Sequence, residues 1–364
     1  QPHPMFTAGD IAWQTREPPW HLASKSEVLA HFEHCRAELR RRVDLVECFG
    51  HDYEGHDEDA DAVFVQLRGP DGRGLGVRAR HCIKAFGFRV PVNPPLVLSS
   101  SRVHSVAPED PRLLDASDAD ADKPVWVIGG GKSGMDTARA ILERFPGREV
   151  HLAIGRGTVF LNRDRAFPRG LARWWRGQPS LATFLDVARR FDGDNESEVF
   201  DWFKREHTVY VGERHAYYML GMQSEAETEY LVTHLASVRN GYVHDVDDDG
   251  SVPVLRFDDG RRCALPAGSY IVNCTGYVMR EDHAYEPYVS PAGRVVAVQP
   301  TSGIDILSSF GAWYLTHLLY LEQLPRLPLY ALDHQAAARR NKQGLAFACT
   351  TQLVHNLLLL DEAL

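Results

Sequence analysis

Apolar positions along the chain follow two periods, one typical of buried strands and one typical of amphipathic helices. The clearest strand is the apolar run at 125–128, which a glycine-rich stretch and then a helix-competent segment at 135–145 follow. A second apolar run, at 149–154, begins about 20 residues after the glycine stretch, as a βαβ unit requires. The pattern therefore predicts an α/β fold with a Rossmann-type unit at its centre.

The remaining elements are predicted from the same periods and from turn residues. A hairpin is expected at 62–67 and 75–82, around Gly69, Pro70, Asp71 and Gly72. The acidic stretch at 115–122 predicts a linker and a domain boundary. Further strands are expected at 43–48, 252–257 and 269–274, and helices at 24–42, 180–190, 196–205, 225–239, 304–321 and 335–360.

The glycine-rich stretch places G-x-G-x-x-G between the first strand and the helix. In such a loop the first glycine makes a tight turn, the second lets a pyrophosphate approach, and the third packs the helix on the strand. The helix N-terminus adds unpaired N–H groups and a positive dipole end. We therefore predict a dinucleotide site that contains Gly129, Gly130, Gly131, Lys132, Ser133 and Gly134.

Two other interpretations of this stretch remain. Lys132 and Ser133 resemble the end of a Walker A loop, but that motif needs a glycine where Trp126 stands, so a P-loop NTPase is disfavoured. A tight structural turn without a ligand is the second alternative. The flanking strand and helix favour the dinucleotide site over both.

The end of the strand at 149–154 bears on the choice of nucleotide. An NAD-preferring site places Asp or Glu there to hold the ribose hydroxyls, whereas this chain continues with Gly155, Arg156 and Gly157. A guanidinium binds the oxygens of a 2′-phosphate in a bidentate way. Arg156 therefore favours NADPH over NADH, the alternative being a solvated loop cation.

Composition limits the classes of partner. A formal net charge of -9 argues against a nucleic-acid or anionic-membrane partner. The six cysteines are scattered without C-x-x-C or zinc spacing, which indicates free thiols in a reducing cytosol and no metal site. No leader and no apolar stretch of bilayer length is present in the 364 residues, so we expect a cytoplasmic protein that acts on a small molecule.

The order of these segments resembles the flavin-containing monooxygenase superfamily, in which an NADPH domain is inserted into a FAD domain. Ala85-Phe86-Gly87 is similar to its Ala-Thr-Gly strand end, and His104-Ser105 to its His-Ser pair. The segment Gly155-Arg156-Gly157-Thr158 resembles its NADPH-phosphate segment. Cys274-Thr275-Gly276 resembles the second Thr-Gly strand end, where the chain returns to the FAD domain.

The resemblance implies an FAD- and NADPH-dependent monooxygenase. Such an enzyme oxygenates a small molecule through a flavin C4a-hydroperoxide, and no protein side chain serves as nucleophile. The implied domains are a FAD-type part at 1–123, an NADPH domain at 124–245 and a FAD-type return at 246–364. It also implies that four further residues contact the cofactors: His104, Thr158, Thr275 and Gly276.

One departure from the superfamily leaves alternatives open. No glycine motif for FAD precedes Gly129, so we expect that the first βαβ unit lies outside this sequence, which starts at Gln1. An NAD(P)H-dependent flavoprotein reductase or oxidase without oxygen transfer is the second hypothesis, disfavoured by the missing C-x-x-C. A flavin-free, non-catalytic protein that binds NADPH is the third.

Overall fold

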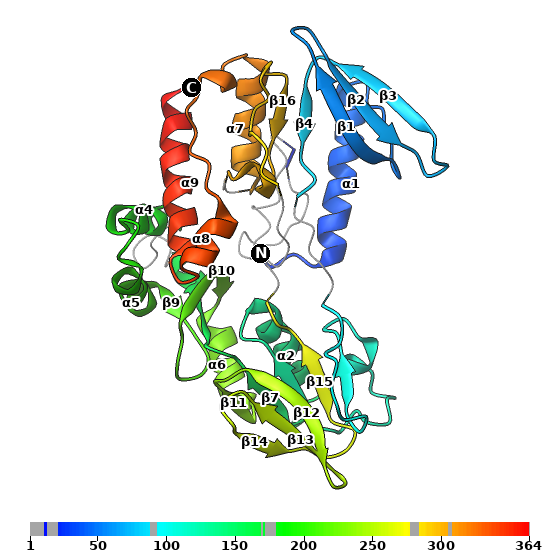
Figure 1. The fold of residues 1–364 in the computed structure, drawn as a ribbon, viewed down its shortest axis with the longest axis vertical. Helices are drawn as coiled ribbons and strands as arrows, with labels where there is room; N and C mark the ends of the chain where they lie inside the picture. Colours follow the sequence, from blue (N-terminus) through cyan, green and yellow to red (C-terminus); the bar gives the residue numbers. More distant parts are fainter. Residues whose placement is uncertain are drawn as a thin grey trace. The chain divides into compact units, whose positions relative to one another are not determined.

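The computed structural model describes residues 11–12, 21–87, 93–168, 170–171, 180–276, 284–304 and 308–363 (Figure 1). The chain forms two compact units. The first unit contains Gln1–Phe88, His283–His334 and Cys349–Leu364, and the second contains Arg89–Asp282 and Gln335–Ala348. The longer part of the second unit is thus inserted in sequence between two segments of the first.

A five-stranded parallel sheet forms the centre of the second unit. The apolar runs that identify its inner strands in the sequence are buried on both faces, as strands of a parallel sheet are. This sheet confirms the predicted α/β class. Its order is β11 (Ser237–Arg239), β7 (Val150–Ala153), β6 (Val125–Ile128), β15 (Tyr270–Asn273) and β5 (His104–Val106).

Helix α2 (Lys132–Arg144) connects β6 to β7 and packs on the sheet through an apolar stripe. Met135, Ala138, Ile141 and Leu142 form that stripe and are buried. Helix α6 (Glu225–His234) contacts α2 and contributes Leu231 to the same core. The 3-10 helix η2 (Pro111–Leu114) also lies against α2.

Two smaller sheets belong to the second unit. One is antiparallel and consists of β12 (Val243–Asp249), β13 (Val252–Phe257) and β14 (Arg262–Ala264). The other has the order β10 (Tyr217–Gln223), β8 (Thr158–Asn162) and β9 (Thr208–Val209). Three helices pack with that second sheet: α3 (Arg163–Ala166), α4 (Ser180–Arg190) and α5 (Glu196–His207).

The first unit starts with α1 (Lys25–Arg42), which Ser24 caps through a capping box with Glu27. An antiparallel sheet of β1 (Asp52–Glu58), β2 (Val63–Arg68) and β3 (Gly74–Ala79) follows. This unit also contains β4 (Cys82–Lys84) with its parallel partner β16 (Val295–Ala297), η4 (Pro300–Ser302), α7 (Ser308–Tyr320) and η5 (Leu324–Arg326).

Several predicted elements differ from the structure. No strand forms at 43–48, where Val46 is 80% exposed and lacks the burial that a strand pattern implies; the polar segment of β1 forms a strand instead. The predicted helix at 225–239 ends at His234, and its last residues become β11 because they pair with β7. Residues 305–307 of the predicted helix at 304–321 lie outside the described residues.

The C-terminal helix predicted at 335–360 is interrupted. It divides into α8 (His334–Arg340) and α9 (Leu345–Glu362), with a turn in which Asn341 Oδ1 accepts a hydrogen bond from the Gln343 N–H. Ala346 and Phe347 pack in the second unit with Phe203 and Tyr218. The start of α9 therefore belongs to that unit, and its continuation belongs to the first.

The predicted segment boundaries at 123/124 and 245/246 differ from the unit boundaries at 88/89 and 282/283. The strands β5 and β15, outside the predicted NADPH segment, pair in the central sheet. The assignment of the segments to FAD-type and NADPH-type domains stays a prediction. Among the described residues, no helix is both long and apolar enough to cross a membrane.

Candidate functional site

The loop between β6 and α2 has glycines where no side chain fits. Gly129 has a φ of +134°, and a Cβ placed on it would lie 2.1 Å from the Cys274 carbonyl oxygen. A Cβ on Gly134 would lie 2.2 Å from the Gly129 carbonyl oxygen. Gly129 thus turns tightly against the end of β15, and Gly134 allows α2 to approach the loop closely.

The middle of the loop is open. Apart from its chain neighbours, no heavy atom of the described residues lies within 4 Å of the Cβ position of Gly131, which is the N-cap of α2 and provides no side-chain cap. The first N–H groups of α2 are therefore available to an anion, and the helix dipole favours negative charge there. Ser133 is exposed in the first turn. This face of the loop can accept a phosphate group.

Thr275 lies beside the loop at the carboxyl end of β15. Its N–H is 2.9 Å from the Cβ position of Gly129. Its hydroxyl donates to Asn273 Oδ1 at 2.7 Å, and Asn93 Nδ2 donates to its carbonyl oxygen at 2.8 Å. Gly276 follows with open space around its Cβ position. The structure thus brings both predicted residues to the edge of the sheet that carries the glycine loop.

Cys274, which precedes them, is buried, and this burial raises the pKa of its thiol to about 11. A thiol with such a pKa stays protonated and unreactive near neutral pH. This supports a packing role for Cys274.

A pocket of about 370 Å³ lies at the carboxyl ends of β7 and β11. A Cβ on Gly130 would lie 2.7 Å from the Ile154 carbonyl oxygen, so the loop directly contacts the segment that enters the pocket. We call it the arginine pocket, because three of its lining residues are arginines. It is lined by Gly155, Arg156, Arg214, His215, Ala216, Asn240, Gly241, Tyr242, Asp259 and Arg261.

Arg156 and Arg261 have partners at the pocket wall. Arg156 donates from Nη1 to the Tyr217 hydroxyl at 2.7 Å, and its Cζ lies 5.1 Å from the ring centroid. Arg261 Nη2 lies 2.6 Å from Asp259 Oδ2. Hydrogen bonding to Asp259 raises the pKa of Arg261, and the same bonds lower the pKa of Asp259. Asp259 therefore stays ionised beside its arginine.

Thr158 and His104 lie apart from the glycine loop. Thr158, half-buried at the start of β8, pairs in register with Tyr217 and so lies beside the arginine pocket. His104 is in register with Tyr270, which pairs with Val125 at the start of β6. Because these strands are parallel, His104 lies at the opposite end of the sheet from the loop.

His104 has a partner at that end. Its Nε2 lies 2.6 Å from Asp120 Oδ2 in the acidic linker, and its ring is 4.8 Å from that of Tyr270. This geometry gives no support for a contact with the cofactor.

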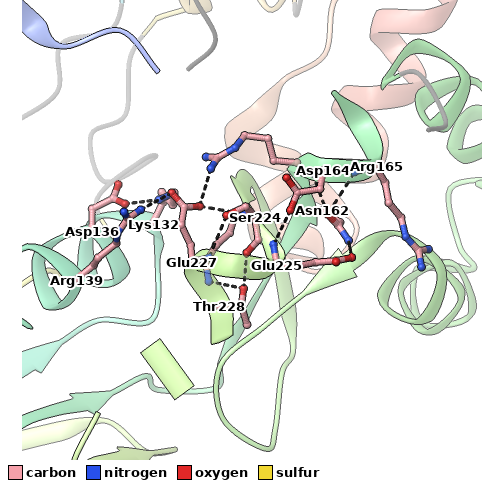
Figure 2. Close-up of polar contacts among 12 residues, drawn as sticks. Lys132, Asp136, Arg139, Asn162, Asp164, Arg165, Ser224, Glu225, Glu227 and Thr228 are labelled. Carbon is pink, nitrogen blue, oxygen red and sulfur yellow. Dashed lines mark hydrogen bonds and ion pairs between the residues drawn. The ribbon is translucent and has the colours of Figure 1, made fainter. Parts of the chain in front are cut away.

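A polar network lies beside the start of α2 (Figure 2). Lys132 pairs with Asp136 within the helix. The buried Glu227, from α6, accepts from Arg139 of α2 at 2.9 Å and from the Ser224 N–H at 2.8 Å. Burial opposes ionisation of Glu227, but the Ser224 N–H and nearby cations outweigh it and lower its pKa. Glu227 therefore remains a carboxylate that ties α6 to the helix of the loop.

Sequence reasoning missed both the network and most of the pocket. The Ser224-x-x-Glu227 spacing is a capping-box signal, and the box is present in the structure. No comparable local signal marks Arg214, Asn240 or Tyr242, which come from loops distant in sequence. The structure assembles them at one end of the sheet.

No protein-family model matches the chain, and no curated protein matches it. The chain is similar to several solved structures. One is S-allyl-L-cysteine S-oxygenase from Allium sativum, with 16% identity, 100% of this chain and 71% of that chain covered, and a TM-score of 0.45. Another is ornithine N-hydroxylase from Kutzneria sp. 744, with 19% identity, 70% and 59% covered, and a TM-score of 0.38.

A third is bacillithiol disulfide reductase from Bacillus cereus, with 14% identity, 82% and 74% covered, and a TM-score of 0.38. This chain spans less than two thirds of the length of the Kutzneria protein. Function is therefore argued below from the residues of this chain.

Proposed function

We propose that the second unit binds NADPH. The observation that carries this proposal is the open, uncapped start of α2 at Gly131, on a loop whose Gly130 packs against Ile154, the residue before the pocket-lining Gly155 and Arg156. The pyrophosphate would lie at the uncapped start of α2, where N–H groups and the helix dipole favour it. The adenosine end would then enter the arginine pocket, at the carboxyl ends of adjacent parallel strands.

The charge of the arginine pocket favours NADPH over NADH. Its three arginines face one carboxylate, that of Asp259, which is already paired with Arg261. A 2′-phosphate is an anion with acceptor oxygens that suit guanidinium groups, whereas the 2′-hydroxyl of NADH has no charge. The pocket therefore offers uncompensated positive charge where NADPH differs from NADH.

We further propose that the chain is part of an FAD- and NADPH-dependent monooxygenase that oxygenates a small molecule. The order of the sequence motifs supports this proposal. Bound FAD would supply hydride acceptance from NADPH and activation of dioxygen. The residues of this chain would hold and orient the two cofactors and exclude water.

The NADPH proposal is tested by titrating the full chain with NADP+ and with NAD+ in a calorimeter. We expect tighter binding of NADP+. A wild-type protein that binds neither nucleotide would refute the proposal. The binding readout requires no flavin, so it separates nucleotide binding from catalysis.

The monooxygenase proposal is tested by visible absorption with added FAD, followed by NADPH under air. Oxygen incorporation into a candidate substrate, coupled to NADPH consumption, would support it. A yellow protein that oxidises NADPH without oxygen transfer to any substrate would instead indicate a flavoprotein reductase or oxidase. A colourless protein that binds NADPH would indicate a flavin-free NADPH-binding protein.

A further inference from the structure

The surroundings of the three arginines in the arginine pocket differ. The guanidinium of Arg261 is paired with Asp259 and also donates to the Asn240 carbonyl oxygen. That of Arg156 donates to the Tyr217 hydroxyl. The exposed side chain of Arg214 makes no hydrogen bond, ion pair or ring contact with the described residues. Among the arginines of this pocket, Arg214 thus keeps all its donors available.

The backbone of Arg214, in contrast, is held at both polar atoms. Asn240 Nδ2 donates to the Arg214 carbonyl oxygen at 2.9 Å, and the Arg214 N–H donates to Asn240 Oδ1 at 3.3 Å. The same Nδ2 lies 3.3 Å from the Gly155 carbonyl oxygen. The side-chain amide of Asn240 therefore joins the segment after β7 to the segment before β10.

A second contact, with Gly157, fixes the backbone of Arg214. Gly157 has a φ of +79°, and a Cβ on it would lie 2.0 Å from the Arg214 carbonyl oxygen. The Gly157 carbonyl oxygen also accepts hydrogen bonds from the N–H groups of Ala216 and Tyr217. A free guanidinium thus stands on a backbone that is fixed before any ligand arrives, which reduces the ordering cost of binding.

We propose that Arg214 is the main residue that selects NADPH over NADH, and that Asn240 is its positioning residue. This inference rests on the proposed function. Arg156 shares Nη1 with Tyr217, so only its Nε and Nη2 edge is free for bidentate phosphate binding. Arg261 has its charge compensated by Asp259. Arg214 adds an uncompensated charge and five free donors.

On this inference, Arg214 strengthens binding of compounds with a 2′-phosphate and does not affect binding of those with a 2′-hydroxyl. When a 2′-hydroxyl replaces the phosphate, water solvates the exposed guanidinium, so NADH binding carries no free-energy penalty from an unpaired charge. Removal of Arg214 should therefore weaken binding of the 2′-phosphate compounds and leave binding of the hydroxyl compounds unchanged. A residue that only shapes the pocket would change the affinity for both.

The experiment measures dissociation constants of the full chain for NADP+, NAD+, adenosine 2′,5′-bisphosphate and AMP. We expect Arg214→Ala to weaken NADP+ and the bisphosphate by about 10- to 100-fold. NAD+ and AMP should change by less than about twofold. Arg214→Lys should retain part of the selectivity, since it keeps the charge. Asn240→Ala should lower the ratio of NAD+ to NADP+ constants by less than Arg214→Ala does.

Arg262→Ala is the matched control, because Arg262 lies on the neighbouring β14, pairs with Asp249 and does not line the arginine pocket. It should leave all four constants unchanged. A thermal melt of each variant confirms that it is folded.

The outcomes separate the two proposals. If the wild-type chain binds none of the four compounds, the proposed function fails and this inference fails with it. If the wild-type chain prefers NADP+ and Arg214→Ala keeps that preference, the inference is overturned and the NADPH proposal stands. It is also overturned if Arg156→Ala removes more of the preference than Arg214→Ala.

Discussion

Arg163 Nη2 lies 3.0 Å from Glu227 Oε2, and the two side chains are only 11% and 9% exposed. The same carboxylate accepts from Arg139, in the helix that follows the glycine loop. Glu227 therefore links α2, α3 and the start of α6 through one buried charge (Figure 2). Breaking a buried pair on one side leaves uncompensated charge, which costs far more than losing a surface pair.

We expect Glu227→Gln to destabilise the protein by about 3 kcal/mol, since Arg163 would lose its buried counter-charge. The measurement is urea unfolding followed by circular dichroism. Glu143→Gln is the control, because Glu143 is the exposed partner of the same Arg139. It should cost less than about 1 kcal/mol. Equal losses in the two variants would contradict the role of Glu227.

The pH dependence of stability follows from the lowered pKa of Glu227. Since the folded state binds this proton less readily than the unfolded state, the contribution is present above the unfolded pKa of about 4.3. It is lost as the pH falls through the folded value. Urea unfolding from pH 7 to pH 3 should show this loss in the wild type. Glu227→Gln should show a smaller loss over the same range, and identical slopes would refute the assignment.

Gly131→Val should abolish NADP+ binding and keep the fold. The side chain would enter the open face where the phosphate is expected, since the described residues place no atom within 4 Å of the Cβ position apart from its chain neighbours. Gly76→Val is the control, because Gly76 in β3 has equally open surroundings but lies in the other unit. Calorimetric titration of both variants checks the prediction. Undiminished affinity in Gly131→Val would exclude the loop as the pyrophosphate site.

Arg156→Ala should weaken binding of NADP+ more than binding of NAD+. The loss should be about tenfold or less, because the guanidinium already donates a hydrogen bond to Tyr217. The measurement is the ratio of the two dissociation constants. Tyr217→Phe is an informative companion, since it removes the hydroxyl that accepts from Arg156 and keeps the ring against its guanidinium. An equal loss for both nucleotides in Arg156→Ala would show that Arg156 does not recognise the 2′-phosphate.

His104→Gln should leave NADP+ affinity within about twofold of the wild type, because His104 lies at the opposite end of the sheet from the loop. Loss of its contact with Asp120 should lower stability by about 1 kcal/mol or less. Calorimetry and urea unfolding measure the two effects. A large loss of nucleotide affinity would contradict this prediction and indicate that His104 contributes to cofactor binding.

The sequence by itself determined the parts of this protein that depend on neighbours along the chain. The strand at Val125–Ile128, the glycine loop and the start of α2 follow from a short apolar run and from backbone conformations open to glycine. The capping box of Ser24 and Glu27 and the apolar stripe of α2 are equally local. Their physical basis lies within a few residues, so the strand, the loop and the helix are predicted directly, whereas the capping box was recognised in the structure.

Only the tertiary structure decided which distant residues meet. Ser237–Arg239 has the local pattern of a helix end, yet it forms β11 because β7 offers an edge for pairing. That pairing carries Asn240 to the backbone of Arg214 and completes the arginine pocket. The same long-range pairing places His104 away from the loop. Strand order is set by burial and hydrogen bonding between segments far apart in sequence. Local periodicity therefore does not predict it.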